Sequence, residues 1–151
     1  MTTDDFISRV DVLNQKIKDS LTTDILVTYS TGLAAKIANR VQKTQILGSG
    51  NTYFYSNYTM QQEDYKKKKN APRKDYRLTG EMWNGFGIKE VKKQTNTVIL
   101  GGKTTVSQYR INKNSERDSD NIIAANEQEE KELADAVAKK VKELIHDTLF
   151  N

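Results

Sequence analysis

The first half of the chain carries apolar residues at helical spacing, with one interruption. An apolar residue recurs every three or four positions over residues 4–19, which predicts a helix there with Thr3 as its N-cap. A second stripe predicts a helix over residues 24–45, and residues 20–23 separate the two helices as a break. The glycine-containing run at residues 47–51 is expected to end the second helix.

The pattern changes after residue 77, where a short helical turn and a β-hairpin are predicted within residues 78–105. Ile88 lies in the first predicted strand, and β-branched residues predict a second strand over residues 97–100. Residues 94–96 suit the turn between the strands, and the glycine pair at 101–102 is expected to end the hairpin.

The remaining elements complete the predicted fold. A further strand is predicted over residues 106–111, and a polar loop over residues 112–121. The last segment predicts a long amphipathic helix, with a capping box between Asn126 and Glu129 at its start. Its apolar stripe consists of Leu133, Val137, Val141, Leu144, Ile145 and Leu149. Together these patterns predict a single α+β domain over residues 1–151, in which a small, mostly antiparallel sheet packs with N-terminal helices and the long C-terminal amphipathic helix.

Between the second helix and the hairpin, residues at about 50–76 show no periodicity and concentrate aromatic and basic side chains. Such a long loop inside a compact domain usually has a functional reason. Lysines contact phosphate and aromatic rings stack on bases, but a basic loop can equally be solvated or meet an acidic protein. We expect an oligomer or partner interface here, formed by Tyr53, Tyr55, Tyr58, Tyr65, Lys66, Lys67, Lys68, Lys69, Arg73, Lys74 and Arg77.

Charge is segregated along the chain although the formal net charge is only +4. Residues 66–77 carry a net charge of +6 and residues 116–135 a net charge of −6. The small net charge and the acidic segment argue against a dedicated nucleic-acid-binding protein. Hydrophobic residues make up 36% of the chain and the mean hydropathy is −0.75, which is typical of a modest core and of subunits that gain burial by assembling.

Catalytic and metal-binding patterns are not found. The chain has no cysteine and a single histidine, His146, which excludes thiolate chemistry and nearly excludes Ser–His catalysis and multi-histidine metal sites. Gly102-Lys103-Thr104 ends like a P-loop, but the first glycine of that motif would fall at Thr97 and no helix is predicted to follow. We therefore expect a non-enzymatic protein without cofactor or metal. The N-terminus is acidic without an apolar leader region, and no run approaches the roughly 20 residues that span a membrane.

Residues 77–83 carry a resemblance. The run Arg77-Leu78-Thr79-Gly80-Glu81-Met82-Trp83 resembles the R-x-T-G-x-L-R signature of small tailed-bacteriophage head–tail joining, tail-completion and virion-morphogenesis proteins, in which a hairpin, a variable loop and a C-terminal helix follow. The chain departs from the family pattern at residues 106–110, where an aromatic-glycine pair is usual, and at residues 120–123, where a Pro-Arg-Pro-Phe motif is usual.

The resemblance implies a structural subunit of a phage neck or tail that forms or joins a homo-oligomeric ring. It implies that Thr79 and Gly80 form a tight bend, and we expect both at the interface. Trp83 fits either the core or an interface anchor, and we include it in the expected interface. The implied partners are copies of the chain, other neck, portal or tail proteins, and non-specifically the genomic DNA in the lumen. The implied location is the virion, after assembly in the host cytoplasm. The alternative is a nucleic-acid-binding accessory protein that uses the tyrosines and lysines of residues 53–74.

Overall fold

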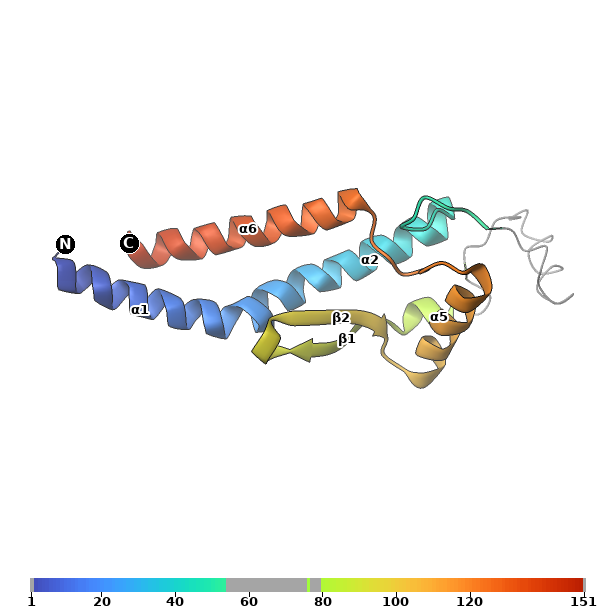
Figure 1. The fold of residues 1–151 in the computed structure, drawn as a ribbon, viewed down its shortest axis with the longest axis horizontal. Helices are drawn as coiled ribbons and strands as arrows, with labels where there is room; N and C mark the ends of the chain where they lie inside the picture. Colours follow the sequence, from blue (N-terminus) through green and yellow to red (C-terminus); the bar gives the residue numbers. More distant parts are fainter. Residues whose placement is uncertain (1, 54–75, 77–79, 151) are drawn as a thin grey trace, which may run out of the picture.

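The N-terminal part of the molecule is one long helical segment. In the computed structural model, which describes residues 2–53, 76 and 80–150, α1 (Thr3–Ser20) continues through η1 (Leu21–Leu26) into α2 (Val27–Thr44) (Figure 1). The N-cap is Thr2 rather than Thr3: the Thr2 side chain accepts from the Asp5 amide, and Asp5 closes the capping box. The two predicted helices are therefore confirmed with a corrected N-cap.

The predicted break at residues 20–23 is wrong, because the chain stays helical there. Residues Leu21–Leu26 form a π-helical turn, in which the Thr23 hydroxyl donates to the Asp19 carbonyl oxygen at 2.7 Å. A π-helical insertion misaligns the ladder of backbone hydrogen bonds and bends a helix without ending it. Figure 1 shows α1 and α2 meeting at an angle at this point.

The end of α2 also differs from the prediction. Gln45, not a glycine, takes the left-handed conformation that closes the helix, with φ of 57°. Gly48 serves another purpose, because a Cβ atom there would collide with the carbonyl oxygens of Ala124 and Ala125. The glycine permits a close approach of two backbones rather than a helix end.

The predicted hairpin is confirmed. The short helix α4 (Glu81–Asn84) precedes it, and η3 (Lys93–Thr95) connects its strands β1 (Phe86–Lys92) and β2 (Thr97–Gly102). The strands pair antiparallel, with Phe86 opposite Gly102. The register shifts between Ile88 and Glu90, which places an extra residue, Lys89, in β1 as a β-bulge. Within the described residues these strands pair only with each other, so each has one unpaired edge.

The strand predicted at residues 106–111 and the loop predicted at 112–121 are wrong, because most of that region is helix α5 (Thr105–Asp118). Thr104 caps this helix by accepting from the Ser107 amide at 3.1 Å. Ser107, Ile111 and Asp118 are its buried residues, and their spacing follows the helical period rather than the alternation of a strand.

The long C-terminal helix is confirmed as α6 (Glu127–Leu149), together with the predicted capping box between Asn126 and Glu129. Glu129 also pairs with Arg40 of α2, through Nε to Oε1 at 2.8 Å and Nη2 to Oε2 at 3.0 Å. Arg40 donates further to the carbonyl oxygens of Ile46 and Ala124. This buried cluster fixes the start of α6 against the end of α2.

The elements form an elongated α+β molecule in which α2 is central. Figure 1 shows α6 along one side of α2 and the hairpin along the other, with both termini at the same end. The core lies where the second half of α2 meets the hairpin and α5, and it consists of Ala34, Ile37, Val41, Leu47, Tyr76, Met82, Trp83, Phe86, Ile111 and Ile122. The predicted fold class is therefore confirmed: a small antiparallel sheet packs with helices that include a long C-terminal one.

Candidate interaction surfaces

The described residues include only part of the predicted interface. Tyr53, Gly80 and Trp83 are described, and the other members lie outside the described residues. Those others are Tyr55, Tyr58, Tyr65, Lys66, Lys67, Lys68, Lys69, Arg73, Lys74, Arg77 and Thr79. What the structure adds is the way in which the two ends of this segment are held.

Both ends of the aromatic and basic segment are tied to the end of α5 by tyrosine–aspartate hydrogen bonds. The Tyr76 hydroxyl donates to Asp118 Oδ2 at 2.6 Å in a buried position, and the Tyr53 hydroxyl donates to Asp120 Oδ2 at 3.2 Å. We call these four residues the tyrosine anchor. Tyr76 has φ of 55°, a value that a bulky residue adopts only where its surroundings hold it. The anchor therefore keeps the two ends of the segment at one end of the molecule.

Asp120 is the most connected member of the anchor. Its Oδ2 also accepts from the Ser49 hydroxyl at 2.6 Å and the Asn51 side-chain amide at 3.0 Å. Burial opposes ionisation of Asp120 and is the largest single influence, but the hydrogen bonds from Ser49, Asn51 and Tyr53 together outweigh it and lower its pKa. Burial and the neighbouring Asp120 carboxylate raise the pKa of Tyr53, so its hydroxyl keeps the proton that it donates.

Gly80 and Trp83 follow the aromatic and basic segment in the chain. Gly80 has φ of 81° immediately before α4, the left-handed conformation expected of glycine at a tight bend. Trp83 is 7% exposed and packs edge-to-face against Phe86, with ring centroids 5.7 Å apart. Of the two roles considered for Trp83, the structure shows the core position.

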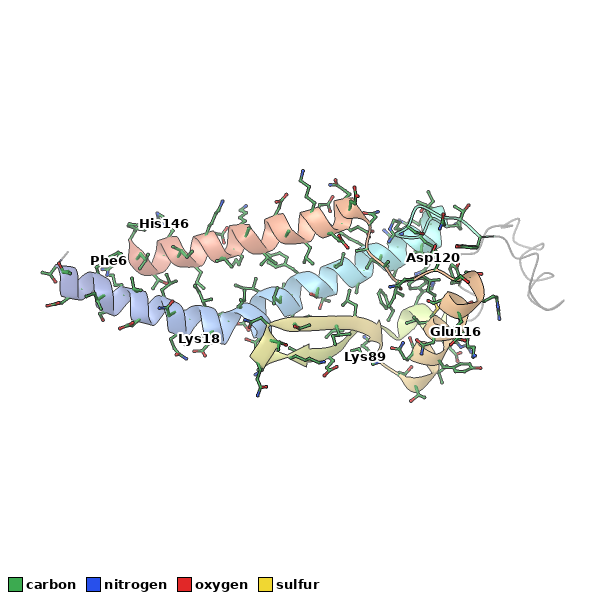
Figure 2. All side chains as sticks on the ribbon, viewed as in Figure 1. Phe6, Lys18, Lys89, Glu116, Asp120 and His146 are labelled. Atoms are coloured by element: carbon green, nitrogen blue, oxygen red, sulfur yellow. The ribbon has the colours of Figure 1, made fainter. Side chains whose placement is uncertain are left out.

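A second candidate surface lies at the opposite end of the molecule, beyond the core. We call the paired helices α1 and α6 the arm, and residues 2–12 with 143–150 its tip. The tip exposes large apolar side chains: Phe6 is 45%, Ile7 54%, Val12 46% and Phe150 65% exposed. Figure 2 shows Phe6 and His146 at this end, far from Asp120. Exposed apolar side chains gathered in one place are typical of protein–protein contact sites.

The acidic segment at residues 116–135 is partly used within the chain. Glu129 is paired with Arg40, Glu132 with Lys36, and Glu116 with Lys113. Asp118 and Asp120 hold the tyrosine anchor. Glu127 and Glu130 at the start of α6, and Asp135 in its middle, are exposed.

The candidate metal ligands and the single histidine can be placed in the described part of the chain. No group of three or more His, Asp or Glu side chains is arranged there to hold a metal ion. His146 is exposed and contacts the Phe150 ring, with centroids 5.6 Å apart. Contrary to prediction, a helix does follow Gly102-Lys103-Thr104, but its start is capped by Thr104 and packed tightly against Gly102. Among the described helices, none combines the length and apolar character needed to cross a bilayer.

The sequence did not indicate Asp118 and Asp120 as partners of the aromatic segment. They lie 42 and 67 positions from the tyrosines that they bind, and no local pattern connects residues so far apart. Comparison of the chain with protein-family models, with curated proteins and with solved structures gave no match.

Proposed function

We propose that this chain is a non-enzymatic structural subunit that assembles into, or joins, a homo-oligomeric ring at the neck or tail of a tailed-bacteriophage virion. The observation that carries the proposal is the arm, whose tip leaves Phe6, Ile7, Val12 and Phe150 exposed away from the core. A lone subunit leaves this apolar surface in water, whereas a neighbouring subunit would cover it.

The hairpin supports the same proposal. A two-stranded sheet is marginally stable by itself, and an unpaired strand edge is a template for pairing with another chain. The outer half of the hairpin is exposed, including Val91 at 37%. Subunits of an assembly commonly carry such incomplete elements, because neighbours complete them.

The phage assignment rests on the resemblance of residues 77–83 to the head–tail joining signature. Gly80 supports it, since the glycine of that signature has the left-handed φ that a tight bend requires. The order of hairpin and final helix after the signature also agrees with the family. Helix α5 stands where the family was expected to have a variable loop.

The alternative function is nucleic-acid binding by the tyrosines and lysines of residues 53–74. The described base of that segment offers it little support, because Asp118 and Asp120 place carboxylates beside Tyr53 and Tyr76. Phosphate would be repelled at this point. Nucleic-acid binding is therefore the second candidate function.

Sedimentation velocity over a range of concentrations, electron microscopy and a DNA filter-binding assay test the proposal. A ring or other high oligomer with weak, sequence-independent DNA binding is expected. A monomer or dimer that binds DNA or RNA tightly would replace the structural role with the accessory role.

A further inference from the structure

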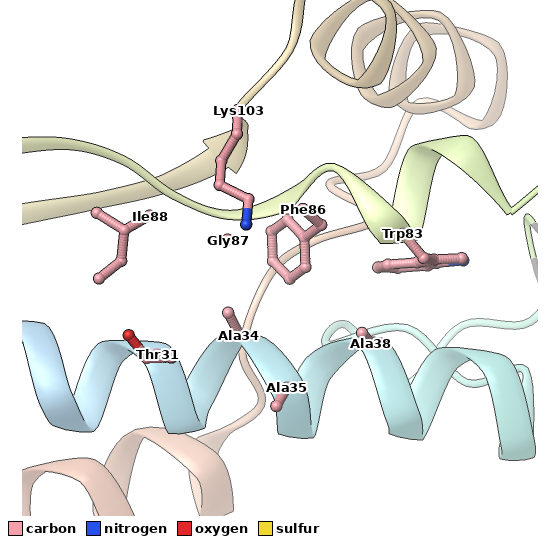
Figure 3. Close-up of a pocket in the computed structure, with 9 residues that line it drawn as sticks. All are labelled: Thr31, Ala34, Ala35, Ala38, Trp83, Phe86, Gly87, Ile88 and Lys103. Atoms are coloured by element: carbon pink, nitrogen blue, oxygen red, sulfur yellow. The ribbon is translucent and has the colours of Figure 1, made fainter.

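An apolar pocket of about 400 Å³ lies between α2 and the hairpin. Ala34 and Ala38 of α2 face Phe86 and Trp83 (Figure 3), and Ala35 and Lys103 also line the pocket. Its volume falls within the range of about 300–1,000 Å³ that is usual for binding pockets. It stays open because the helix presents only short side chains to the aromatic residues across from it.

Lys103 gives this pocket a single positive charge. Its amine extends over Gly87 toward α2, as Figure 3 shows, and lies 3.4 Å from where a Cβ atom of Gly87 would be. The Lys103 side-chain amine has no hydrogen-bond or ion-pair partner among the described residues, and no carboxylate lines the pocket. Apolar walls beside one ammonium group suit an apolar side chain that is flanked by a carboxylate.

The tip of the arm has that chemistry. Exposed Phe6, Ile7 and Phe150 lie in the same turns of helix as the exposed carboxylates of Asp4, Asp5 and Asp147. The tip as a whole carries a net charge of −4, from Asp4, Asp5, Asp11, Glu143 and Asp147 against Arg9. The hairpin region at residues 86–103 carries a net charge of +3, from Lys89, Lys92, Lys93 and Lys103 against Glu90.

We infer that the arm tip of one copy docks into the α2–hairpin pocket of the next, with tip apolar side chains against the alanine and aromatic walls and a tip carboxylate beside Lys103. The inference rests on the proposed function, since it requires copies of the chain to associate. Complementary charge steers such a contact, while the apolar anchors supply most of its affinity.

The pocket cannot be filled by its own arm. Phe6 precedes Thr31, the first pocket residue on α2, by 25 residues of one bent helical segment, about 37 Å measured along that segment at 1.5 Å per residue. Figure 1 shows α1 leading away from the hairpin. The tip therefore points away from its own pocket and must come from a neighbour. A contact between two different patches is head-to-tail, and it closes into a ring where the rotation between subunits allows it.

Two variants with changes only at exposed positions test the docking. The pocket variant carries Ala35→Glu and Lys103→Glu, and the tip variant carries Phe6→Ser and Ile7→Ser. The tip variant keeps its acidic residues, so its changed tip is repelled by the acidic pocket of the other variant and the two changed surfaces do not pair. Each variant alone is expected to self-associate at least about thirtyfold more weakly than wild type, as for the loss of a central apolar anchor. Lys43→Glu, on an exposed part of α2 away from both surfaces, is the matched control and should assemble as wild type does.

Mixing the two variants gives the sharper result. The intact tip of the pocket variant and the intact pocket of the tip variant form one good interface, so a 1:1 heterodimer that grows no further is expected in sedimentation velocity. Circular dichroism and thermal melts of each variant check that it is folded. If wild type assembles and both folded variants assemble equally well, or if the mixture forms no heterodimer, the docking is wrong although the assembly role stands. A wild type that is monomeric at every concentration overturns both.

Discussion

At the scale of single residues, Arg40 joins parts of the chain that no local sequence pattern connects. Its guanidinium joins the carboxylate of Glu129 to the carbonyl oxygens of Ile46 and Ala124, and its side chain is only 13% exposed. Arg40→Ala is expected to lower the free energy of unfolding by about 3 kcal/mol, because it leaves the Glu129 charge buried without its partner. Chemical denaturation of the two proteins measures the difference.

The exposed pair of Lys36 and Glu132 is the matched control for Arg40. Both side chains are about half exposed, and Lys36→Ala should therefore cost less than about 1 kcal/mol. Adding Glu129→Gln to Arg40→Ala should recover part of the loss, since glutamine removes the unpaired charge and keeps an acceptor for the Asn126 amide. Equal effects of the Arg40 and Lys36 variants would contradict a special role for Arg40.

Asp120 makes the tyrosine anchor sensitive to pH. Its pKa in the folded protein is lowered below the ordinary value of 3.8, so its contribution to stability is complete above that value and is lost as the pH falls through the folded pKa. Asp120→Asn should cost about 1–2 kcal/mol at pH 7, where the carboxylate accepts from three side chains.

Denaturation at a series of pH values measures this difference. The gap between wild type and Asp120→Asn should begin to shrink near pH 3.8 and should close as the pH falls through the lowered folded pKa, where Asp120 in the folded protein takes up a proton. Asp135→Asn, at an exposed position in the middle of α6, is the control and should show a small effect at every pH. A gap that stays constant down to acid pH would mean that the charge of Asp120 does not stabilise the anchor.

At the scale of elements, Gly102 sets the junction between β2 and α5. A Cβ atom there would collide with the backbone of Gln108 in the first turns of α5, and that backbone cannot move without shifting the helix. Gly102→Ala should therefore destabilise the protein by at least about 2 kcal/mol. Gly32→Ala is the control: it adds a methyl group in open space within α2 and should stabilise by about 0.5–1 kcal/mol. Thermal melts that ranked the two variants in the reverse order would contradict this role for Gly102.

The elements that sequence patterns predicted correctly are those whose signals are local. The hairpin and α6 have such signals in their β-branched residues and in the capping box of Asn126 and Glu129. Residues 106–111 at the start of α5 were predicted as a strand because they include β-branched and aromatic residues such as Val106 and Tyr109. In the structure these two side chains face solvent, at 51% and 60% exposure. Two of the buried residues of α5, Ser107 and Asp118, are polar, so no apolar stripe marks its helical face.

The candidate surfaces were predictable only in part, for a related reason. Composition indicates the aromatic and basic segment, but the partners of its tyrosines come from a different element, the end of α5. The pocket at Lys103 depends on small residues, such as Ala34 and Ala38, lying opposite Trp83 across the fold. Small residues give a pocket its space without any signal in the sequence. Such sites become visible only once the packing of elements is known.

At the scale of the whole molecule, the fold separates its surfaces along one long axis. Asp120 of the tyrosine anchor lies at one end and Phe6 of the arm tip at the other (Figure 2). The pocket lies between α2 and the hairpin, nearer the middle of the molecule. A subunit with distinct surfaces at its two ends can contact one neighbour with each. Helix α6, whose first turns carry the exposed residues Glu127 and Glu130, lies on the side of α2 away from the hairpin.

The lysine run at residues 66–69 gives the last prediction, which rests on the sequence because these residues lie outside the described part. Reversing Lys66, Lys67, Lys68 and Lys69 to glutamate should slow assembly strongly at low salt, since charges at the rim of an interface mainly set the association rate. The effect should shrink near 1 M salt, where the Debye length falls to about 3 Å. Light scattering after dilution into each salt concentration measures the rate.

A control that reverses Lys18, Lys43, Lys139 and Lys142 changes the net charge equally at exposed helical positions and separates total charge from position. If the lysine-run variant assembles at the wild-type rate at low salt and loses only DNA affinity, the run faces nucleic acid in the lumen rather than a neighbouring subunit. If neither rate nor affinity changes, the run is a solvated segment. In that case apolar contacts alone must drive assembly, and the prediction that charge sets the assembly rate is wrong.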